Sequence, residues 1–250
     1  PRPARAEWPR SPLQGVPFCT ATDEQVGTQA VPDGAGGMLV VWQDLRTHVD
    51  YDLYAQHVLA SGAPDPGWPV NGRAICTAVH AQQKPRIASD GLGGLFVVWE
   101  DYRNGTGANN ADLYAQHVLA AGTLDPWWPS QGLAVCTAAG DQLVPTIVPD
   151  EFGSAWIAWQ DGRASAFDVY AAHLYAGGGV DVPNGFALCS APDGQGSQAM
   201  STDGAGGAYV VWHDFRSQTD WDIYAQHVTY QGLDAAWPVD GVAVCAMPGH

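Results

Sequence analysis

The sequence predicts an all-β protein, a β-propeller of four-stranded antiparallel blades with about four repeats plus one extra N-terminal strand. The first reason is a duplicated block whose tryptophan recurs at Trp42, Trp99, Trp159 and Trp212, which are 57, 60 and 53 residues apart by subtraction. The second reason is composition: 30 glycines and 18 prolines, against ten lysines and arginines, suit short strands and tight turns. Sheets that cannot bury both faces alone must stack on their neighbours.

The second repeat displays the order of strands most clearly. Alternating apolar residues predict strand one at 85–90, strand two at 95–103 and strand three at 112–119. The glycine-rich segment 90–94 predicts the first hairpin turn, because glycine reaches positive φ without strain. Residues 73–76 of the preceding unit have the pattern of strand four. Each unit therefore forms one twisted sheet.

The repeats divide the chain into equivalent units. We expect a single propeller domain, 1–250, with units at about 25–76, 82–136, 142–189 and 195–245, and with 8–19 as an extra copy of the last strand. Sequence alone leaves open whether this spare strand lengthens the last blade, pairs with another molecule or is the remnant of a longer array. The third unit departs from the pattern, since it has Ala172 in place of glutamine and Val182-Pro183 in place of Trp-Pro.

Charge excludes some partners. A formal net charge of −16 repels a phosphate backbone, and no basic stripe offsets it, so nucleic acid is excluded. No apolar run approaches the roughly 18 residues that span a bilayer, so no membrane span is expected. The sequence instead points to other protein copies, cell-surface components or glycans as partners.

A triad motif recurs in all four units. Trp-x-Asp-x-Arg places its three side chains on one face of strand two, and the hairpin returns an aspartate beside them, so that arginine could bridge two carboxylates. Because the motif recurs in every blade, we expect it to lock the hairpin and pack between blades rather than to bind a ligand. The members are Trp42, Asp44, Arg46 and Asp52; Trp99, Asp101, Arg103 and Asp112; Trp159, Asp161, Arg163 and Asp168; and Trp212, Asp214, Arg216 and Asp222.

Tryptophans outside the triad are candidates for glycan binding, because an aromatic face stacks on the apolar face of a pyranose. The candidates are Trp8, Trp68, Trp127, Trp128 and Trp237. Trp-Pro before a turn is equally suited to packing under the outer strand, and both interpretations remain open.

Acidic pairs at hairpin ends are the best candidates for metal binding. Asp50 with Asp52, and Asp220 with Asp222, offer the clustered oxygen ligands that Ca²⁺ favours, although a solvated acidic turn explains them as well. No other cofactor is indicated. The repeated histidines of strand three lie in separate blades, and we expect them to be structural.

The five cysteines occupy equivalent places in successive repeats, so most are expected to be small buried thiols. The one candidate disulfide joins Cys19 to Cys245, which could meet if the spare first strand pairs with the last.

The block Trp-x-Asp-x-Arg followed by Asp-(Leu/Ile)-Tyr-Ala-Gln resembles the repeats of large secreted bacterial proteins with propeller-like arrays, mostly of unassigned activity. The resemblance covers nearly the whole chain and implies a propeller fold and an extracellular or cell-surface location. The matching positions are Trp42, Asp44, Arg46, Asp52, Tyr54 and Gln56, with Trp99, Asp101, Arg103, Asp112, Tyr114 and Gln116 in the next unit.

Catalytic motifs are lacking in the sequence, and Lys84, Glu100 and Glu151 break the repeat only singly, as surface drift would. The favoured hypothesis is a non-enzymatic secreted or cell-surface module, a structural scaffold or filament subunit that acts through protein contacts. The alternative is a carbohydrate-binding propeller with a shallow site between neighbouring blades, and the third hypothesis is a glycan-cleaving enzyme.

Overall fold

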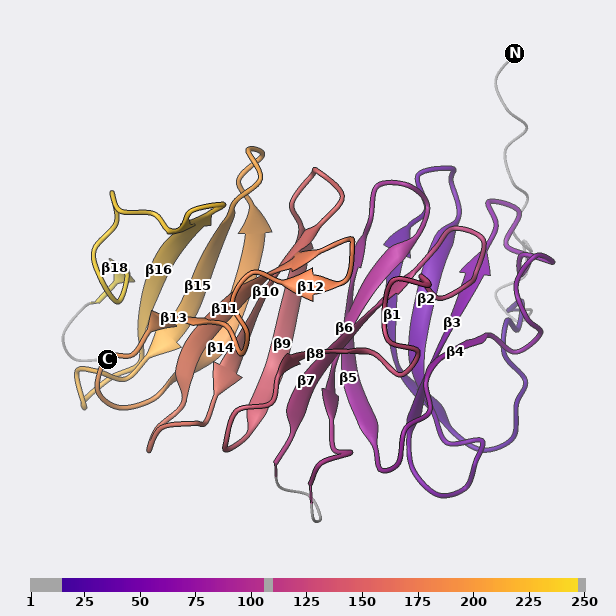
Figure 1. Cartoon of the computed structure of the whole chain (residues 1–250), viewed down its shortest axis with the longest axis horizontal. Helices are drawn as coiled ribbons and strands as arrows, with labels where there is room; N and C mark the ends of the chain where they lie inside the picture. Colours follow the sequence, from indigo (N-terminus) through magenta and orange to yellow (C-terminus); the bar gives the residue numbers. More distant parts are fainter. Residues whose placement is uncertain (1–14, 106–109, 247–250) are drawn as a thin grey trace.

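Four antiparallel β-sheets follow one another along the chain in the computed structural model, which describes residues 15–105 and 110–246 (Figure 1). The described residues contain no helix, and consequently none that is long and apolar enough to cross a membrane. The strands are β1 Gln25–Pro32, β2 Met38–Asp44, β3 Asp52–Val58 and β4 Arg73–Cys76; β5 Gln82–Ser89, β6 Leu95–Asp101, β7 Asp112–Val118 and β8 Leu133–Cys136; β9 Gln142–Pro149, β10 Ala155–Asp161, β11 Asp168–Tyr175, β12 Gly179–Val180 and β13 Phe186–Cys189; and β14 Gln195–Thr202, β15 Ala208–Asp214, β16 Asp222–Thr229, β17 Gly232–Leu233 and β18 Val242–Cys245. The all-β propeller of four repeated blades is confirmed.

Each blade is a meander in which sequential strands pair. The first two sheets have the orders β1-β2-β3-β4 and β5-β6-β7-β8. In the third and fourth, the outer strands β13 and β18 pair with β11 and β16, and the two-residue strands β12 and β17 pair with the same strands further along. Strand one of every blade carries a bulge near its start, as between Gly196 and Ala199 of β14. In the second and third blades the bulge meets the preceding blade, because the N–H of Lys84 donates to Gln43 and that of Val144 donates to Glu100.

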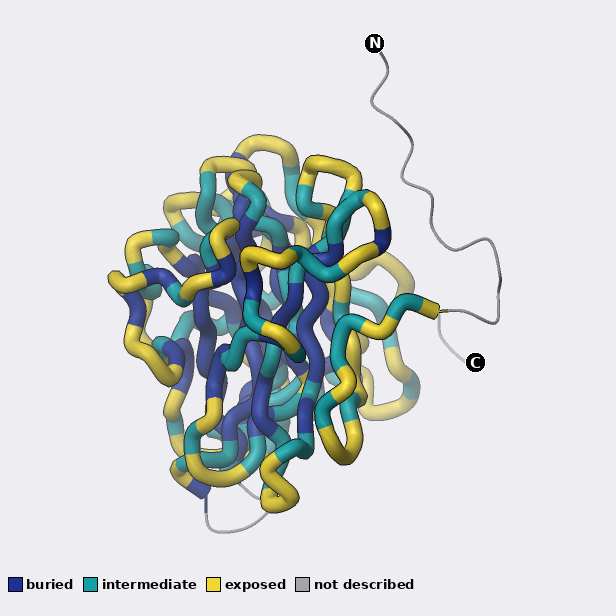
Figure 2. Tube along the Cα trace, turned by 90° about the vertical axis from the view of Figure 1, so that its right-hand side faces the viewer, coloured by how far each residue is buried: buried dark blue, intermediate teal, exposed yellow. Residues whose placement is uncertain are grey.

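The core lies between the blades. One apolar cluster fills each of the three gaps between adjacent sheets, and the first of these joins Leu39 and Val41 of β2 to Leu95 and Val97 of β6. The inner strands β1, β5, β9 and β14 contact one another in that order. Buried residues accordingly run along the strands, and exposed residues concentrate in the loops around them (Figure 2).

One glycine explains why Trp-Pro-x-x-Gly recurs before strand four. Gly132 has φ +94°, and a Cβ there would lie 2.5 Å from Cη2 of Trp99. Gly72, Gly185 and Gly241 stand in the same relation to the triad tryptophans of their own blades. Any larger residue would strain the backbone and also displace the indole at the centre of the blade.

The two ends of the row differ. The extra copy of strand four lies mostly outside the described residues, and its described end, 15–19, holds no strand. Phe18 and Cys19 nevertheless pack on Trp42 of the first blade. At the other end, Tyr209 and Val211 of β15 are exposed, whereas Phe96 and Val98 of β6, their counterparts, are fully buried. Of the two end blades, therefore, only the first has its outward face covered by described residues.

Candidate functional site

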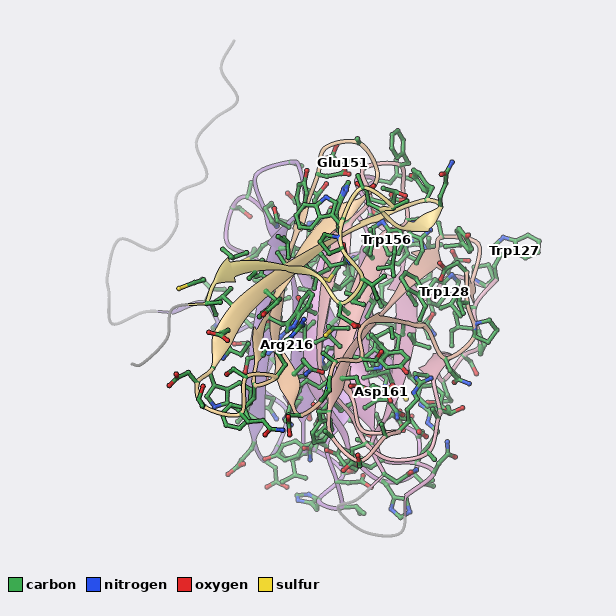
Figure 3. The ribbon with its side chains drawn as sticks, turned by 90° about the vertical axis from the view of Figure 1, so that its left-hand side faces the viewer. Trp127, Trp128, Glu151, Trp156, Asp161 and Arg216 are labelled. Carbon is green, nitrogen blue, oxygen red and sulfur yellow. The ribbon has the colours of Figure 1, made fainter. Side chains whose placement is uncertain are left out.

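The triad forms a buried clamp in every blade. The indole Nε1 of Trp42, Trp99, Trp159 and Trp212 donates to the triad aspartate at 2.7–2.9 Å. The arginine pairs with the same carboxylate and lies over a strand-three tyrosine, with its Cζ 3.6–4.0 Å from the ring centroid (Figure 3 labels Asp161 and Arg216). All four aspartates are fully buried. Burial alone would raise the pKa of Asp44, but hydrogen bonds from Arg46 and Trp42 lower it overall.

The clamp also joins each blade to the blade before it. Arg103 Nη2 donates to Cys76 Sγ of the preceding blade at 3.1 Å and to the carbonyl oxygen of Gln131 at 2.7 Å. Arg46 makes the equivalent bond to Cys19 at 3.6 Å, so residue 19 takes the place of a preceding blade. The arginine does not bridge two carboxylates as expected, because its only ion pair in the described structure is with Asp101 or its counterparts.

The repeated histidines form a second structural link. His57 lies 2.8 Å from Asp65 and 2.9 Å from Asp33, which ties the loop after strand three to the first hairpin. His117 and His227 repeat this Asp–His–Asp bridge. Burial alone would lower the pKa of His227, but the two carboxylates beside it raise it overall. Each histidine holds its own blade together.

The outer tryptophans separate into two groups. Trp68 and Trp128 are only 4 % and 5 % exposed, and their indoles donate to the carbonyl oxygens of Ala120 and Ala176 in the next blade. They are packing plugs and cannot stack on a sugar, so this part of the prediction is wrong. Trp127 points away from the molecule and is 81 % exposed (Figure 3). Trp237 is half-buried beside Tyr209, and Trp8 lies outside the described residues.

The structure supports neither the candidate disulfide nor the candidate metal pairs in the residues that it describes. Cys19 and Cys245 are both free thiols, attached to the first and the last blade of the row, so the candidate disulfide is absent. Burial raises the pKa of the Cys76 and Cys136 thiols to about 11, as expected for inert packing residues. Within 15–105 and 110–246, no three His, Cys, Asp or Glu side chains are grouped to hold a metal ion. Neither Asp50 with Asp52 nor Asp220 with Asp222 is therefore part of such a group.

Two departures from the repeat meet in the structure although the sequence suggests no connection. Lys84 Nζ lies 3.0 Å from the carboxylate of Glu100, whose side chain is fully buried. Glu100 also accepts hydrogen bonds from Tyr102 Oη and, across the blade boundary, from the backbone N–H of Val144. The prediction of surface drift is wrong for this pair. Because Glu100 is sealed and fully paired, it braces three segments rather than facing a ligand.

A cavity of about 490 Å³ opens between the third and fourth blades, and sequence reasoning missed it. Its aromatic walls are Phe167, which precedes β11, and Trp221, which precedes β16 and is 61 % exposed. The ring centroids of Trp221 and Phe215 are 5.0 Å apart. Polar side chains complete the lining, which in full is Gln160, Phe167, Gly194, Gln195, Gly196, Ser197, His213 and Trp221.

Two small residues in the lining interrupt the repeat, and one of them leaves room for the side chain of Gln160. Gly196 stands where Val26, Gln83 and Leu143 stand in the other blades, and a Cβ there would overlap the amide of Gln160. Gly194 stands where the third repeat has Asp141. Comparing the glycines between repeats, together with the aromatic residue before strand three, is the signal that could have found this site.

Comparison with known proteins supports the fold. No family model and no curated protein matches the chain. Among solved structures, the α-L-arabinanase of Penicillium chrysogenum complexed with arabinobiose is similar with a TM-score of 0.56, 10 % identity, and coverage of 92 % of this chain and 69 % of that chain. A thermostable family-43 glycoside hydrolase is similar with a TM-score of 0.53 and 10 % identity, and the match covers 92 % of this chain and 80 % of that chain. A protein of unknown function from Dyadobacter fermentans is similar with a TM-score of 0.54 and 9 % identity, and the match covers 87 % of this chain and 69 % of that chain.

This comparison overturns the favoured sequence hypothesis. Two of these three similar structures are named as enzymes that act on glycans, which contradicts the expectation of a non-enzymatic scaffold or filament module. The prediction that the chain is not an enzyme gains no support either, since glycoside hydrolases share its fold. At about 10 % identity the likeness establishes the β-propeller fold alone.

Proposed function

We propose that this chain binds carbohydrate in the cavity between the third and fourth blades. The observation that carries the proposal is Trp221, which is 61 % exposed and lines a cavity that is also lined by Phe167. An exposed indole beside a second ring offers a flat apolar surface for a pyranose or furanose. The volume of about 490 Å³ is within the usual range for small-molecule sites and suits one or two sugar rings.

The polar lining indicates a neutral sugar. Gln160 offers an amide, Ser197 a hydroxyl and His213 an imidazole, and all three can exchange hydrogen bonds with sugar hydroxyls. The lining contains no lysine or arginine, which a uronate or sulfated sugar would require. The net charge of −16 further disfavours an anionic glycan.

Binding has better support than cleavage at this site. Glycoside hydrolysis ordinarily uses two carboxyl groups on either side of the scissile bond. No aspartate or glutamate is among the residues that line the cavity. A reducing-end assay on every saccharide that binds tests cleavage directly.

The first experiment is calorimetric titration with neutral arabino-, xylo- and cello-oligosaccharides. Replacing Trp221→Ala is expected to weaken binding about tenfold or more, because about 1.4 kcal/mol of stacking corresponds to that factor. The control is Trp127→Ala, which removes an even more exposed indole outside the cavity. A tenfold loss in the control with none in Trp221→Ala would place the site on the outer rim and overturn the proposal.

A second variant tests the cavity without removing an aromatic ring. Gly196→Leu introduces the residue that the third repeat carries at this place, Leu143, and the fold should accept it once the flexible amide of Gln160 moves aside. Its side chain would overlap the present position of the Gln160 amide, a lining group, and the displacement of that amide is expected to abolish binding. Unchanged affinity in this variant, or no binding of any saccharide to the native chain, contradicts the assignment.

A further inference from the structure

The structure assigns a second, independent site to the first blade: we infer that the cavity beside Asp52 binds a primary ammonium group. This cavity of about 680 Å³ lies at the loops of the first two blades and shares no residue with the saccharide cavity. Its lining is Thr47, Val49, Asp50, Asp52, Tyr54, Thr77, Ala78, Val79 and His80.

Asp52 is the residue that points to a ligand. It is only 2 % exposed, and its Oδ2 receives no hydrogen bond from any residue in the described ranges. A buried carboxylate oxygen without a donor is costly, since the loss of such a partner costs about 1–3 kcal/mol or more for a charged group. Asp52 is among the residues that line the cavity, so a donor held there lies next to this side chain, and a rotation of the buried carboxylate would turn Oδ2 towards it.

The second blade contains the missing donor at the equivalent place. Asn104 Nδ2 donates to Asp112 Oδ2 at 2.8 Å and lies 3.3 Å from Tyr114 Oη. The first repeat has Thr47 at the position of Asn104, and its hydroxyl bonds instead to the carbonyl oxygen of Asp50 at 3.4 Å. An N–H donor therefore belongs between the carboxylate and the tyrosine, and the first blade supplies none from its own loop.

Charge favours a cationic donor over a neutral one. The charged groups around the position are Asp44, Asp50 and Asp52 against the single guanidinium of Arg46, a balance of three negative charges to one positive. His80 and Tyr54 are the other titratable groups of the lining. An ammonium group offers three N–H donors and a full charge, and charge-assisted hydrogen bonds are about twice as strong as neutral ones. The side chains of Val49 and Val79 can contact an alkyl chain that carries it.

The test is an NMR titration of the whole chain at pH 7.5 with n-butylammonium. The matched probes are n-butanol and tetramethylammonium. Butylammonium is expected to bind at least about tenfold more tightly than either control, because butanol lacks the charge and tetramethylammonium lacks N–H donors. Equal affinity for the three probes, or no binding of butylammonium, overturns the inference.

Two substitutions at one position separate the site from the fold. Thr47→Asn introduces the donor that Asn104 provides in the second blade and is expected to weaken butylammonium binding about tenfold by occupying Asp52 internally. Thr47→Val, which keeps the shape but has no donor for Asp52, should bind like the native chain. Loss of binding in both variants, or in neither, contradicts the role assigned to Asp52. A lysine tripeptide titrated alongside distinguishes a peptide source of the ammonium from a small amine.

Discussion

Replacing Asp101→Ala is expected to lower the free energy of unfolding by about 3–5 kcal/mol, the usual result of breaking a buried ion pair. Asp101 is fully buried and accepts hydrogen bonds from the indole of Trp99 and from the guanidinium of Arg103. Its removal leaves both donors in the core without their partner. Because Arg103 also holds Cys76 of the preceding blade, the damage extends across the blade boundary.

Urea denaturation followed by tryptophan fluorescence measures this effect. The matched control is Glu151→Ala, which removes an exposed carboxylate and should change stability by no more than about 0.5 kcal/mol. The double variant Asp101→Ala with Arg103→Leu should be less destabilised than the sum of its parts, since the arginine no longer remains buried and unpaired. Strict additivity, or a loss below about 1 kcal/mol for Asp101→Ala, would show that the clamp contributes little.

Asp52→Asn is expected to stabilise the protein at pH 7, by up to about 3 kcal/mol. Burial, followed by the nearby charges of Asp50 and Asp44, raises the pKa of Asp52 from 3.8 to about 6. Each pKa unit corresponds to about 1.36 kcal/mol. Since the folded state holds this proton more tightly than the unfolded state, stability falls as pH rises from about 4 to 6 and stays low above pH 6. Asparagine carries no charge and avoids this loss.

The measurement is the free energy of unfolding at intervals between pH 4 and 8, for the native chain and the variant. The difference between them should be near zero at pH 4, grow towards pH 6 and then level off. Asp168, whose pKa burial and the neighbouring Asp161 also raise to about 6, provides a second test, and Asp168→Asn should reproduce the profile. A difference that is constant across this range would rule out the titration of Asp52 as its cause.

These two predictions describe different uses of buried charge. The clamp aspartates have their partners within the blade, so every repeat keeps them. Asp52 destabilises the native chain at neutral pH, and the same substitution that stabilises the fold is expected to remove ammonium binding. Functional sites often retain such residues at a cost in stability.

The sequence by itself determined the repeat and the blade. The period between Trp42 and Trp99, the alternation within each strand and the glycine turns are local patterns, and they predicted four sheets whose first and last strands begin and end within the expected units. The structural roles of Trp99, Asp101 and Arg103 also followed from recurrence. These features depend on neighbours close along the chain, which a sequence displays directly.

Only the tertiary structure decided which departures from the repeat matter. Lys84 meets Glu100 because strands one and two pair, and Trp221 and Phe167 line one cavity because two blades pack side by side. The absent side chain at Gly196 has a meaning only when the Gln160 amide of the preceding blade is seen to fill its place. Likewise, Asp52 is recognisable as unpaired only after the partner of Asp112 is seen. Contacts between blades join residues about 50 positions apart, and burial at those contacts separates a packing tryptophan from an exposed one.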